Sequence, residues 1–332
     1  MTVDEIAKRA NVSKATVSRV INESGYVSKE KREKVLSVLK DIDYQIPENT
    51  RKAGIRRIHT IGVVVSEMTN PYFLSAFEGI ASVADQYDID VVFYNSDRNP
   101  EKEIRALKRL KEMQVQGIII APTLDFDNFQ SSQRFGEAMN NTKIPIVFMD
   151  ATAEQDERDG VFFDNFAGAF KAVDAMIQAG HREIGILTGD RRIKTVRDRF
   201  RGYCKALEVN GIERRDNFIL EGDFTREGAY RTAKEYLKNG KMPQAIFTCN
   251  NFTTEGFFKA VLEEKLVLGQ DIFCMAFDKL EQFDMFGLNY SYLERNPWEM
   301  GKAAMEMLLE RLKNPSILCT RKIIPFHIIM NS

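Results

Sequence analysis

Short runs rich in valine and isoleucine alternate with helix-length segments through residues 60–332, and this alternation constrains the fold more than any other feature. The apolar runs are 60–65, 90–95, 117–121, 145–149, 183–189, 245–250 and 271–277. The segments with a helical pattern are 72–87, 101–113, 166–179, 196–210, 225–238, 252–264 and 298–313. Because apolar strands separated by helices form doubly wound parallel sheets, the pattern predicts an α/β body. Its length exceeds one comfortable core, which favours two lobes.

The expected sheets also predict where a small molecule would bind. In open α/β sheets the ligand lies outside the carboxyl ends of the strands, so two lobes would place it in the cleft between them. A dinucleotide or nucleoside triphosphate is not expected there, because no GxGxxG follows the first strand and no GxxxxGK[ST] occurs in the sequence.

Catalytic and metal-binding groups are scarce in this sequence. The three histidines, His59, His181 and His327, form no readable constellation with a nucleophile. The four cysteines lack the spacing of a zinc site. We therefore expect a protein that is not an enzyme and that needs no cofactor or metal.

The first residues do not have the pattern of a signal peptide. Charged side chains between Asp4 and Arg9 stand where its apolar core would be needed, and no apolar run approaches the ~20 residues of a membrane span. We expect a cytoplasmic protein without a membrane partner, and free cysteines inside apolar runs fit that reducing compartment.

Residues 1–45 predict three short helices. Thr2 followed by Glu5 forms a capping box ahead of residues with helical spacing. Ser13 and Ser28 stand at the cap positions of two further helices. The first two helices are expected at about 3–10 and 14–22. Two short helices joined by a tight turn, with a third behind them, are typical of a helix-turn-helix domain.

The second of these helices has two distinct faces. Val17, Val20 and Ile21 lie three and four residues apart and form its apolar face. The opposite face carries Lys14, Ala15, Ser18, Arg19 and Asn22. In helix-turn-helix domains this face enters the major groove, where Arg19 can pair with guanine and Lys14 with guanine or phosphate. The residues suited to phosphate oxygens are Ser13 and Thr16. A solvated amphipathic helix would show the same pattern.

The charge distribution also bears on nucleic acid binding. Residues 1–60 carry 13 Lys and Arg against 8 Asp and Glu, a net charge of +5, whereas the whole chain carries −1. A basic head on an acidic body favours contact with nucleic acid through the head alone. A chance unevenness in the distribution of charge would give the same difference.

Residues 3–44, and the string VSKATVSRVIN (12–22) above all, resemble the DNA-binding head of the lactose and galactose repressor (LacI/GalR) family. The resemblance implies that Lys14, Ala15 and Thr16 read base edges and that Arg19 is the family's basic contact. The supporting contacts that it implies are Thr2, Ser13, Ser18, Asn22 and Ser28. It also implies a homodimer on a pseudo-palindromic operator in double-stranded DNA.

The segment 46–59 departs from the family's hinge, which is a helix that inserts a leucine into the minor groove and kinks the operator. The leucine position holds Ala53 when it is counted from Tyr44, and Gly54 when it is counted from Pro47. Alanine is too small to unstack bases well, and glycine weakens a helix by about 1 kcal/mol. We therefore expect weaker bending of the operator or a different half-site spacing.

Four strings in the body resemble the family's effector domain, which is similar to type I periplasmic sugar-binding proteins. They are TNPYF (69–73), GHREIGILTG (180–189), EGDFTREGAY (221–230) and AFD (276–278). The effector contacts implied by the resemblance are Arg199, Asp278, Asn70, Tyr72 and Phe73, with Phe224, Thr195, Asp150 and Asp164 as further candidates. Aromatic rings stack on a sugar face while charged groups pair with its hydroxyls, so we expect a sugar or a sugar phosphate. The aromatic residues would equally suit a core, and Arg199 a surface.

One departure bears on the ligand. Asn250-Asn251 stands where relatives usually have an aspartate, which indicates a different ligand or a phosphorylated one. The basic residues nearby that could neutralise a phosphate are Arg191, Arg192 and Lys194.

The resemblance also implies the organisation of the chain. The expected parts are a helix-turn-helix domain at 1–45, a hinge linker at 46–59 and an effector-binding and dimerisation domain at 60–332. The N-lobe is expected at about 60–161 and 293–321, and the C-lobe at about 162–292 and 322–332. We expect a transcription regulator of carbohydrate metabolism genes, in the simplest case a repressor, under allosteric control by the ligand. Two alternatives stay open, namely control by a phosphocarrier protein and a solute-binding receptor without a DNA function.

Overall fold

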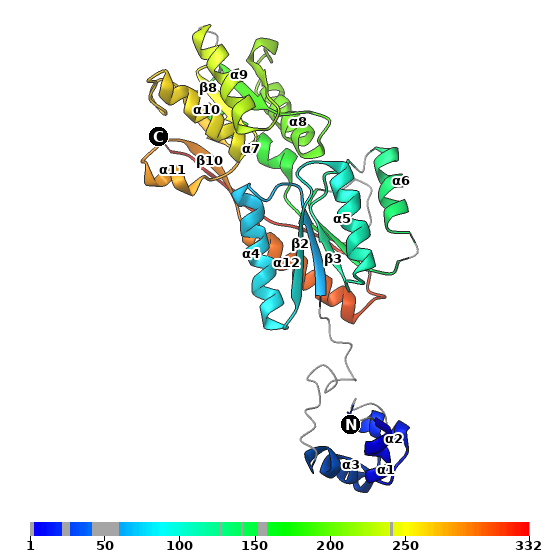
Figure 1. The fold of residues 1–332 in the computed structure, drawn as a ribbon. Helices are drawn as coiled ribbons and strands as arrows, with labels where there is room; N and C mark the ends of the chain where they lie inside the picture. Colours follow the sequence, from blue (N-terminus) through cyan, green and yellow to red (C-terminus); the bar gives the residue numbers. More distant parts are fainter. Residues whose placement is uncertain are drawn as a thin grey trace. The chain divides into compact units, whose positions relative to one another are not determined.

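The computed structural model describes residues 3–21, 27–41, 60–125, 128–140, 142–151, 158–239 and 242–331. The chain separates into two units, Met1–His59 and Thr60–Ser332, and each unit has a core of its own (Figure 1).

The first unit is a small helical head. Its helices are α1 (Val3–Arg9), α2 (Lys14–Ile21) and α3 (Lys29–Asp41). Ile6, Val17 and Val35 are fully buried where the three helices meet. At the start of α2 the Ser13 Oγ accepts a hydrogen bond from the Thr16 backbone N–H at 3.1 Å, which satisfies one of the free donors of the first turn. The expected three-helix head is confirmed.

The first sheet of the second unit is parallel throughout, in the order β11-β5-β4-β3-β1-β2. Its strands are β1 (Thr60–Val65), β2 (Asp90–Asn95), β3 (Ile118–Ile120), β4 (Ile146–Asp150), β5 (Gly160–Phe162) and β11 (Arg321–Ile323). Its helices are α4 (Pro71–Gln86), α5 (Pro100–Glu112), α6 (Phe129–Ala138) and α12 (Pro297–Lys313). Helices α5 and α6 cover one face, and α4 packs beside α12 on the other (Figure 1).

The second sheet repeats this plan in the order β12-β10-β9-β8-β6-β7, and only the β10–β12 pair in it is antiparallel. Its strands are β6 (Ile184–Thr188), β7 (Ile219–Glu221), β8 (Ala245–Thr248), β9 (Phe273–Ala276), β10 (Ser291–Arg295) and β12 (Phe326–Ile329). Its helices are α7 (Asn165–Gln178), α8 (Lys194–Val209), α9 (Arg226–Lys238), α10 (Asn251–Glu263) and the short α11 (Glu281–Met285), with a 3₁₀ turn, η2, at Asp216–Phe218. Separate apolar clusters fill its two faces, one under α7 and α8 and one under α9 and α10.

The two sheets share one topology, which fixes where a ligand can bind. In each sheet the first strand lies between the second and third strands, so the strand order reverses beside β1 and beside β6. Crevices form at such switch points, outside the carboxyl ends of the strands. The chain crosses between the sheets after β5, after β10 and after β11, which joins the lobes at those same ends. The expected two-lobed α/β body is confirmed.

Helices α4 and α12 approach each other closely beside this crevice. A Cβ on Gly301 would overlap the backbone of Ala76, and one on Gly79 would overlap the backbone of Trp298. Because glycine has no side chain, the two helices can touch at these positions. The start of α4 contributes residues to the site described below.

Two further properties concern the whole described part of the chain. Among its helices none is long and apolar enough to cross a membrane. In the described part of the chain, no group of three or more His, Cys, Asp or Glu side chains is arranged so that it could hold a metal ion.

Candidate effector cavity and DNA-binding helix

The face of α2 that the sequence assigns to DNA is accessible. Lys14, Ala15, Ser18 and Arg19 are exposed, and Thr16 is half-buried. The apolar face of the same helix is buried against α1 and α3. A helix with one face anchored in the core and one basic, exposed face can enter the major groove without rearrangement.

Hydroxyl and ammonium groups gather at the N-terminus of α2. A hollow on the head is lined by Lys8, Lys14 and Lys31 together with Ser13 and Thr16. Positive side chains beside a helix N-terminus suit a phosphate oxygen of a duplex. Ser28 precedes α3, where it is half-buried and its carbonyl oxygen accepts from the Arg32 N–H at 3.0 Å. The other assigned residues, Thr2, Asn22 and Ala53, lie outside the described residues.

A cavity of about 590 Å³ lies in the crevice between the two lobes of the second unit. The predicted effector contacts that line it are Asn70, Tyr72, Phe73, Asp150, Thr195, Arg199, Phe224 and Asp278. Asp164 is placed elsewhere. It is exposed and caps α7, because its Oδ1 accepts a hydrogen bond from the Ala167 N–H at 2.8 Å.

Strand ends and helix starts from both sheets position these side chains. Asn70 caps α4, Asp150 ends β4 and Asn250 caps α10. Asp278 lies two residues beyond β9, and Arg199 lies near the start of α8. Residues that are distant in sequence therefore meet because the carboxyl ends of parallel strands face one cavity.

The aromatic wall of the cavity is also part of the core. Tyr72, Phe73 and Phe224 are buried, yet each lines the cavity. Phe224 has a positive φ of 66°, and its ring lies where a Cβ on Gly189 would fall. The two interpretations that the sequence left open for the aromatic residues, core and cavity wall, therefore hold together.

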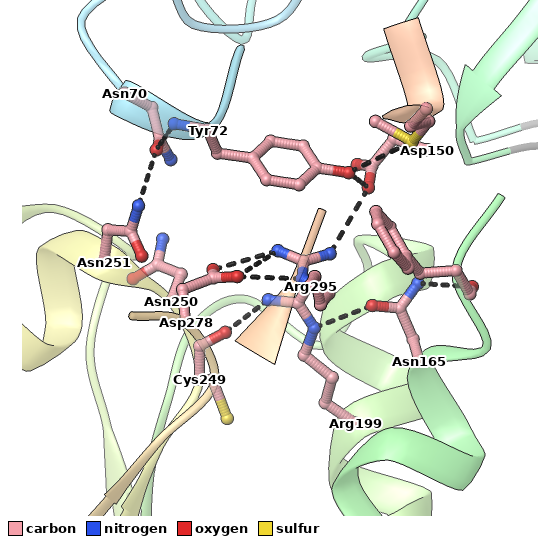
Figure 2. A network of polar contacts seen from close by, with 12 residues as sticks. Asn70, Tyr72, Asp150, Asn165, Arg199, Cys249, Asn250, Asn251, Asp278 and Arg295 are labelled. Carbon is pink, nitrogen blue, oxygen red and sulfur yellow. Dashed lines mark hydrogen bonds and ion pairs between the residues drawn. The ribbon is translucent and has the colours of Figure 1, made fainter. Parts of the chain in front are cut away.

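At the base of the cavity, Arg295 and Asp278 form a buried ion pair (Figure 2). Arg295 Nε donates to Asp278 Oδ1 at 2.8 Å, and Nη2 donates to Oδ2 at 2.9 Å. This fork is the geometry in which guanidinium and carboxylate match best. Burial is the largest influence on the Arg295 pKa and lowers it, but Asp278, Tyr72 and Asp150 together outweigh burial and raise that pKa.

Tyr72 links this pair to Asp150. Its hydroxyl donates to Asp150 Oδ1 at 2.6 Å and also contacts the Met300 Sδ at 3.4 Å (Figure 2). Burial, followed by the negative charge of Asp150, raises the pKa of Tyr72 well above its ordinary value. Tyr72 therefore stays a neutral donor that holds the carboxylate at the cavity wall.

Arg199 is the second buried guanidinium of the cavity. Its Nε donates to Asn165 Oδ1 at 2.9 Å, its Nη1 donates to the Cys249 carbonyl oxygen, and its Cζ lies 3.7 Å from the centre of the Phe277 ring. Burial, and then the charge of Arg295, lowers its pKa to about 10. At neutral pH it keeps its charge. Because Arg199 is buried, the possibility that it is a surface residue does not apply.

Several contacts cross the cleft. Asn251 Nδ2 donates to Asn70 Oδ1 at 3.0 Å, and Arg98 Nη1 donates to the Phe224 carbonyl oxygen at 3.3 Å. An ion pair also crosses it, from Arg197 to Asp125 at 3.2 Å. These polar contacts hold the two lobes together around the cavity.

Reasoning from sequence missed Arg295, the residue with the most contacts at the base of the site. It ends a strand whose sequence, SYLER, contains too many polar residues to look buried. One signal was available, because the residue stands just before the Asn-Pro start of α12, at the strand end where site residues gather. Asn165, which orients Arg199, was also missed.

One wall of the cavity depends on a buried acid. Glu103 of α5 is fully buried, and its carboxylate accepts from the backbone N–H groups of Thr123 and Leu124, which line the cavity. Burial raises the Glu103 pKa to about 7, although both hydrogen bonds oppose the shift. A proton on this carboxyl therefore stabilises the fold.

We expect the Glu103 contribution to the free energy of unfolding to decline with rising pH. It is fully present below the ordinary pKa near 4.5 and is lost as the pH rises to about 7, by at most about 1.4 kcal/mol per pH unit. Urea unfolding of wild type and Glu103→Gln between pH 5 and 8 measures this. The wild type should lose stability relative to the variant as the pH rises, and parallel curves would contradict the assignment.

Comparison with known proteins agrees with this geometry. Residues 2–47 match the model of the bacterial regulatory proteins of the lacI family. Residues 58–325 match the model of periplasmic binding proteins and the sugar-binding domain of the LacI family. The ribose operon repressor of Haemophilus influenzae is 29% identical over 315 residues, which cover 95% of this chain and 93% of that protein.

Solved structures share this fold. The lac repressor dimer bound to operator and the anti-inducer ONPF has a TM-score of 0.78 at 24% identity and covers 100% of this chain and 98% of its own. The complex of the transcriptional regulator CelR with cellobiose has a TM-score of 0.72 at 22% identity. The match covers 100% of this chain and 99% of the CelR chain. Because the family models match both the head and most of the body, this protein is a member of the LacI family of bacterial regulatory proteins, a DNA-binding transcription regulator and not an enzyme.

Proposed function

We propose that this protein is a dimeric regulator of carbohydrate metabolism genes, whose affinity for a pseudo-palindromic operator changes when a sugar or a sugar phosphate fills the cavity. The observation that carries the proposal is the combination, in one chain, of an exposed basic α2 face with a cavity lined by buried charged groups and aromatic rings. In this scheme residues 1–45 read DNA, and residues 60–332 bind the effector and dimerise. Residues 46–59 are the linker between these two parts. A regulator of chromosomal genes works in the cytoplasm.

The cavity has the chemistry that a hydroxylated ring requires. Asp150 and Asp278 accept hydrogen bonds from hydroxyls, Arg199 donates to them, and Phe73 and Phe224 offer apolar surface to the ring. The H. influenzae relative is named for a ribose operon, and the CelR structure contains cellobiose. Both names support a sugar as the class of ligand.

Allosteric control follows from the contacts across the cleft. A ligand that touches both lobes changes the balance of the Asn70–Asn251, Arg98–Phe224 and Arg197–Asp125 contacts, which set the closure of the crevice. Operator affinity changes by the difference in ligand affinity between the open and closed states, typically about 1–3 kcal/mol.

The experiment that tests the proposal has two stages. Operators are first selected from random duplexes with the full-length protein, and the anisotropy of the selected duplex then follows binding while a panel of sugars and sugar phosphates is added. A preferred palindrome and at least one sugar that changes its affinity are expected. Failure to prefer any duplex would refute the DNA function, and a palindrome insensitive to the whole panel would leave a protein cue such as a phosphocarrier.

Exposed apolar side chains on the second lobe support a dimer. Met285 and Phe286, at the end of α11, are 85% and 75% exposed. Val267, in the same lobe, is also exposed. Large exposed apolar groups that cluster on a soluble protein mark an interface. A second copy is the occupant we assign, since one head reads too few base pairs for specificity and the lac repressor structure is a dimer.

We expect the Phe286→Asp variant to shift the protein from dimer to monomer and to weaken operator binding at least 10-fold, because a charge would be buried at the interface. Light scattering after gel filtration measures the mass. Phe129→Asp is the matched control, since Phe129 is 80% exposed but lies on α6 of the first lobe. Equal masses for the two variants would remove α11 from the interface.

A further inference from the structure

One donor at the base of the cavity has no acceptor. Arg295 uses Nε and Nη2 in its fork with Asp278, while its Nη1 is buried and makes no hydrogen bond within the described part of the chain. The nearest carboxylate oxygen beyond the fork, Asp150 Oδ1, is 3.8 Å away and already accepts from Tyr72. The side chain is only 3% exposed and lines the cavity. An unmade bond to a buried cation is costly, so an oxygen from a ligand is the expected acceptor.

Arg199 makes no ion pair with a described residue, although the negative charges of Asp278 and Asp150 act on it from further away. Its hydrogen bonds go to neutral acceptors, the Asn165 side chain and the Cys249 carbonyl. Among the residues that the structure describes, no carboxylate comes within ion-pair distance of it. Those bonds use Nε and Nη1, which leaves Nη2 for a group in the cavity that Arg199 lines.

The guanidinium groups of Arg199 and Arg295 lie close to each other in the cavity. Both guanidinium groups lie over the Phe277 ring, with Cζ at 3.7 Å for Arg199 and 4.9 Å for Arg295, and Figure 2 shows them next to each other. Like charges this close repel in a cavity shielded from water. An anion that accepts from both would relieve the repulsion, whereas a neutral hydroxyl would relieve only the missing hydrogen bond.

We propose that the effector is an anionic sugar, whose carboxylate or phosphate accepts hydrogen bonds from Arg295 Nη1 and Arg199 at the base of the cavity. The inference rests on the proposed function and adds to it the charge of the ligand and a specificity residue, Arg295. The ring hydroxyls then face Asp150 and Asn250, which line the same cavity. The volume of about 590 Å³ has room for a monosaccharide acid or phosphate.

The test compares neutral and anionic partners of the same ring. Full-length protein is titrated with D-glucose, D-galactose and D-ribose, with D-glucuronate and D-galacturonate, and with the glucose 6-phosphate and ribose 5-phosphate esters. All titrations are done at one ionic strength, by calorimetry and by melting temperature. At least one acid or ester should bind 10-fold or more tightly than its neutral partner. The carboxylate and phosphate arms identify which anion the arginines hold.

Two variants assign the preference to Arg295. Arg295→Gln keeps an amide donor without the charge, and Arg295→Gln/Asp278→Asn removes the ion pair together, so that neither charge is left alone if the single variant unfolds. Both should reduce the preference for the anionic partner at least 10-fold. Arg215→Gln, in an exposed pair with Glu183, is the control and should leave binding unchanged.

The outcomes separate the two levels of the argument. Neutral sugars that bind as tightly as their anionic partners, or an anion preference that survives in both Arg295 variants, would overturn this inference and leave the sugar-responsive regulator standing. Absence of binding by every member of the panel would instead contradict the sugar effector itself.

Discussion

Replacement of Asp278 with alanine should lower the free energy of unfolding by about 3–5 kcal/mol, because Arg295 stays charged and buried but loses the carboxylate of its fork. Asp150 Oδ1, at 3.8 Å from Arg295 Nη1, is then the remaining carboxylate within ion-pair distance among the described residues. The Arg295 side chain is 3% exposed and that of Asp278 is 10% exposed, so the lost partner stood in a largely buried pair. Urea unfolding of the full-length protein, followed by tryptophan fluorescence or circular dichroism, measures the change. The fluorescence signal comes from Trp298, which lies at the start of α12 in the same lobe as Tyr72.

The loss of stability depends on whether one charge of the ion pair or both charges are removed. Asp278→Ala combined with Arg295→Met removes both charges, so most of the lost stability should return. Glu183→Ala breaks an exposed pair with Arg215 and should cost no more than about 1 kcal/mol. If Asp278→Ala were as mild as Glu183→Ala, the fork at the base of the cavity would not be buried as the structure has it.

The instability also affects how ligand response is tested. A variant that removes Asp278 alone loses both an effector contact and the counterion of Arg295, so a lost response would not distinguish recognition from folding. The double variants that remove both charges separate recognition from folding. They leave no unpaired charge at the base of the cavity, but they change which ligands the cavity can bind.

The sequence predicted the sheets well because burial on both faces leaves a clear pattern. Runs such as TIGVVV and AIFTCN became β1 and β8, and the helices between them begin at caps such as Asn70 and Asn250. Strand β10 was not predicted, because SYLER contains polar residues within it. The short strands β5, β7 and β11 were not predicted either. Each has three residues, too few for any periodicity, and their pairing is decided by neighbouring strands.

The site was predictable only in part, for a related reason. Strand ends converge by topology, so Asn70, Arg199 and Asp278 could be assigned to one crevice from sequence and family resemblance. Asp164 also follows a strand, but its carboxylate accepts from the Ala167 N–H at the start of α7 and does not line the cavity. Which side chain pairs across the lobes, as Asn251 does with Asn70, depends on packing that no local pattern contains.

Arg19→Ala should reduce affinity for the selected operator by roughly 30-fold or more. A bidentate arginine–guanine contact contributes about 1–3 kcal/mol, and a two-fold dimer loses it in both half-sites. Arg19 is exposed on α2, and the buried face of that helix does not include it, so the fold of the head should persist. Anisotropy titrations with the selected duplex and with a scrambled duplex measure the loss.

The comparison of duplexes shows which kind of contact was lost. A residue that reads a base matters for the operator and little for scrambled DNA, whereas a phosphate contact affects both and lowers the salt dependence of binding. Lys14→Ala, beside the phosphate-suited hollow, should show a share of the second behaviour. Lys34→Ala removes the same charge from an exposed pair with Glu30 on α3 and should change little. Equal losses for Arg19→Ala on both duplexes would make Arg19 an electrostatic contact and leave base reading to Lys14, Ala15 and Thr16.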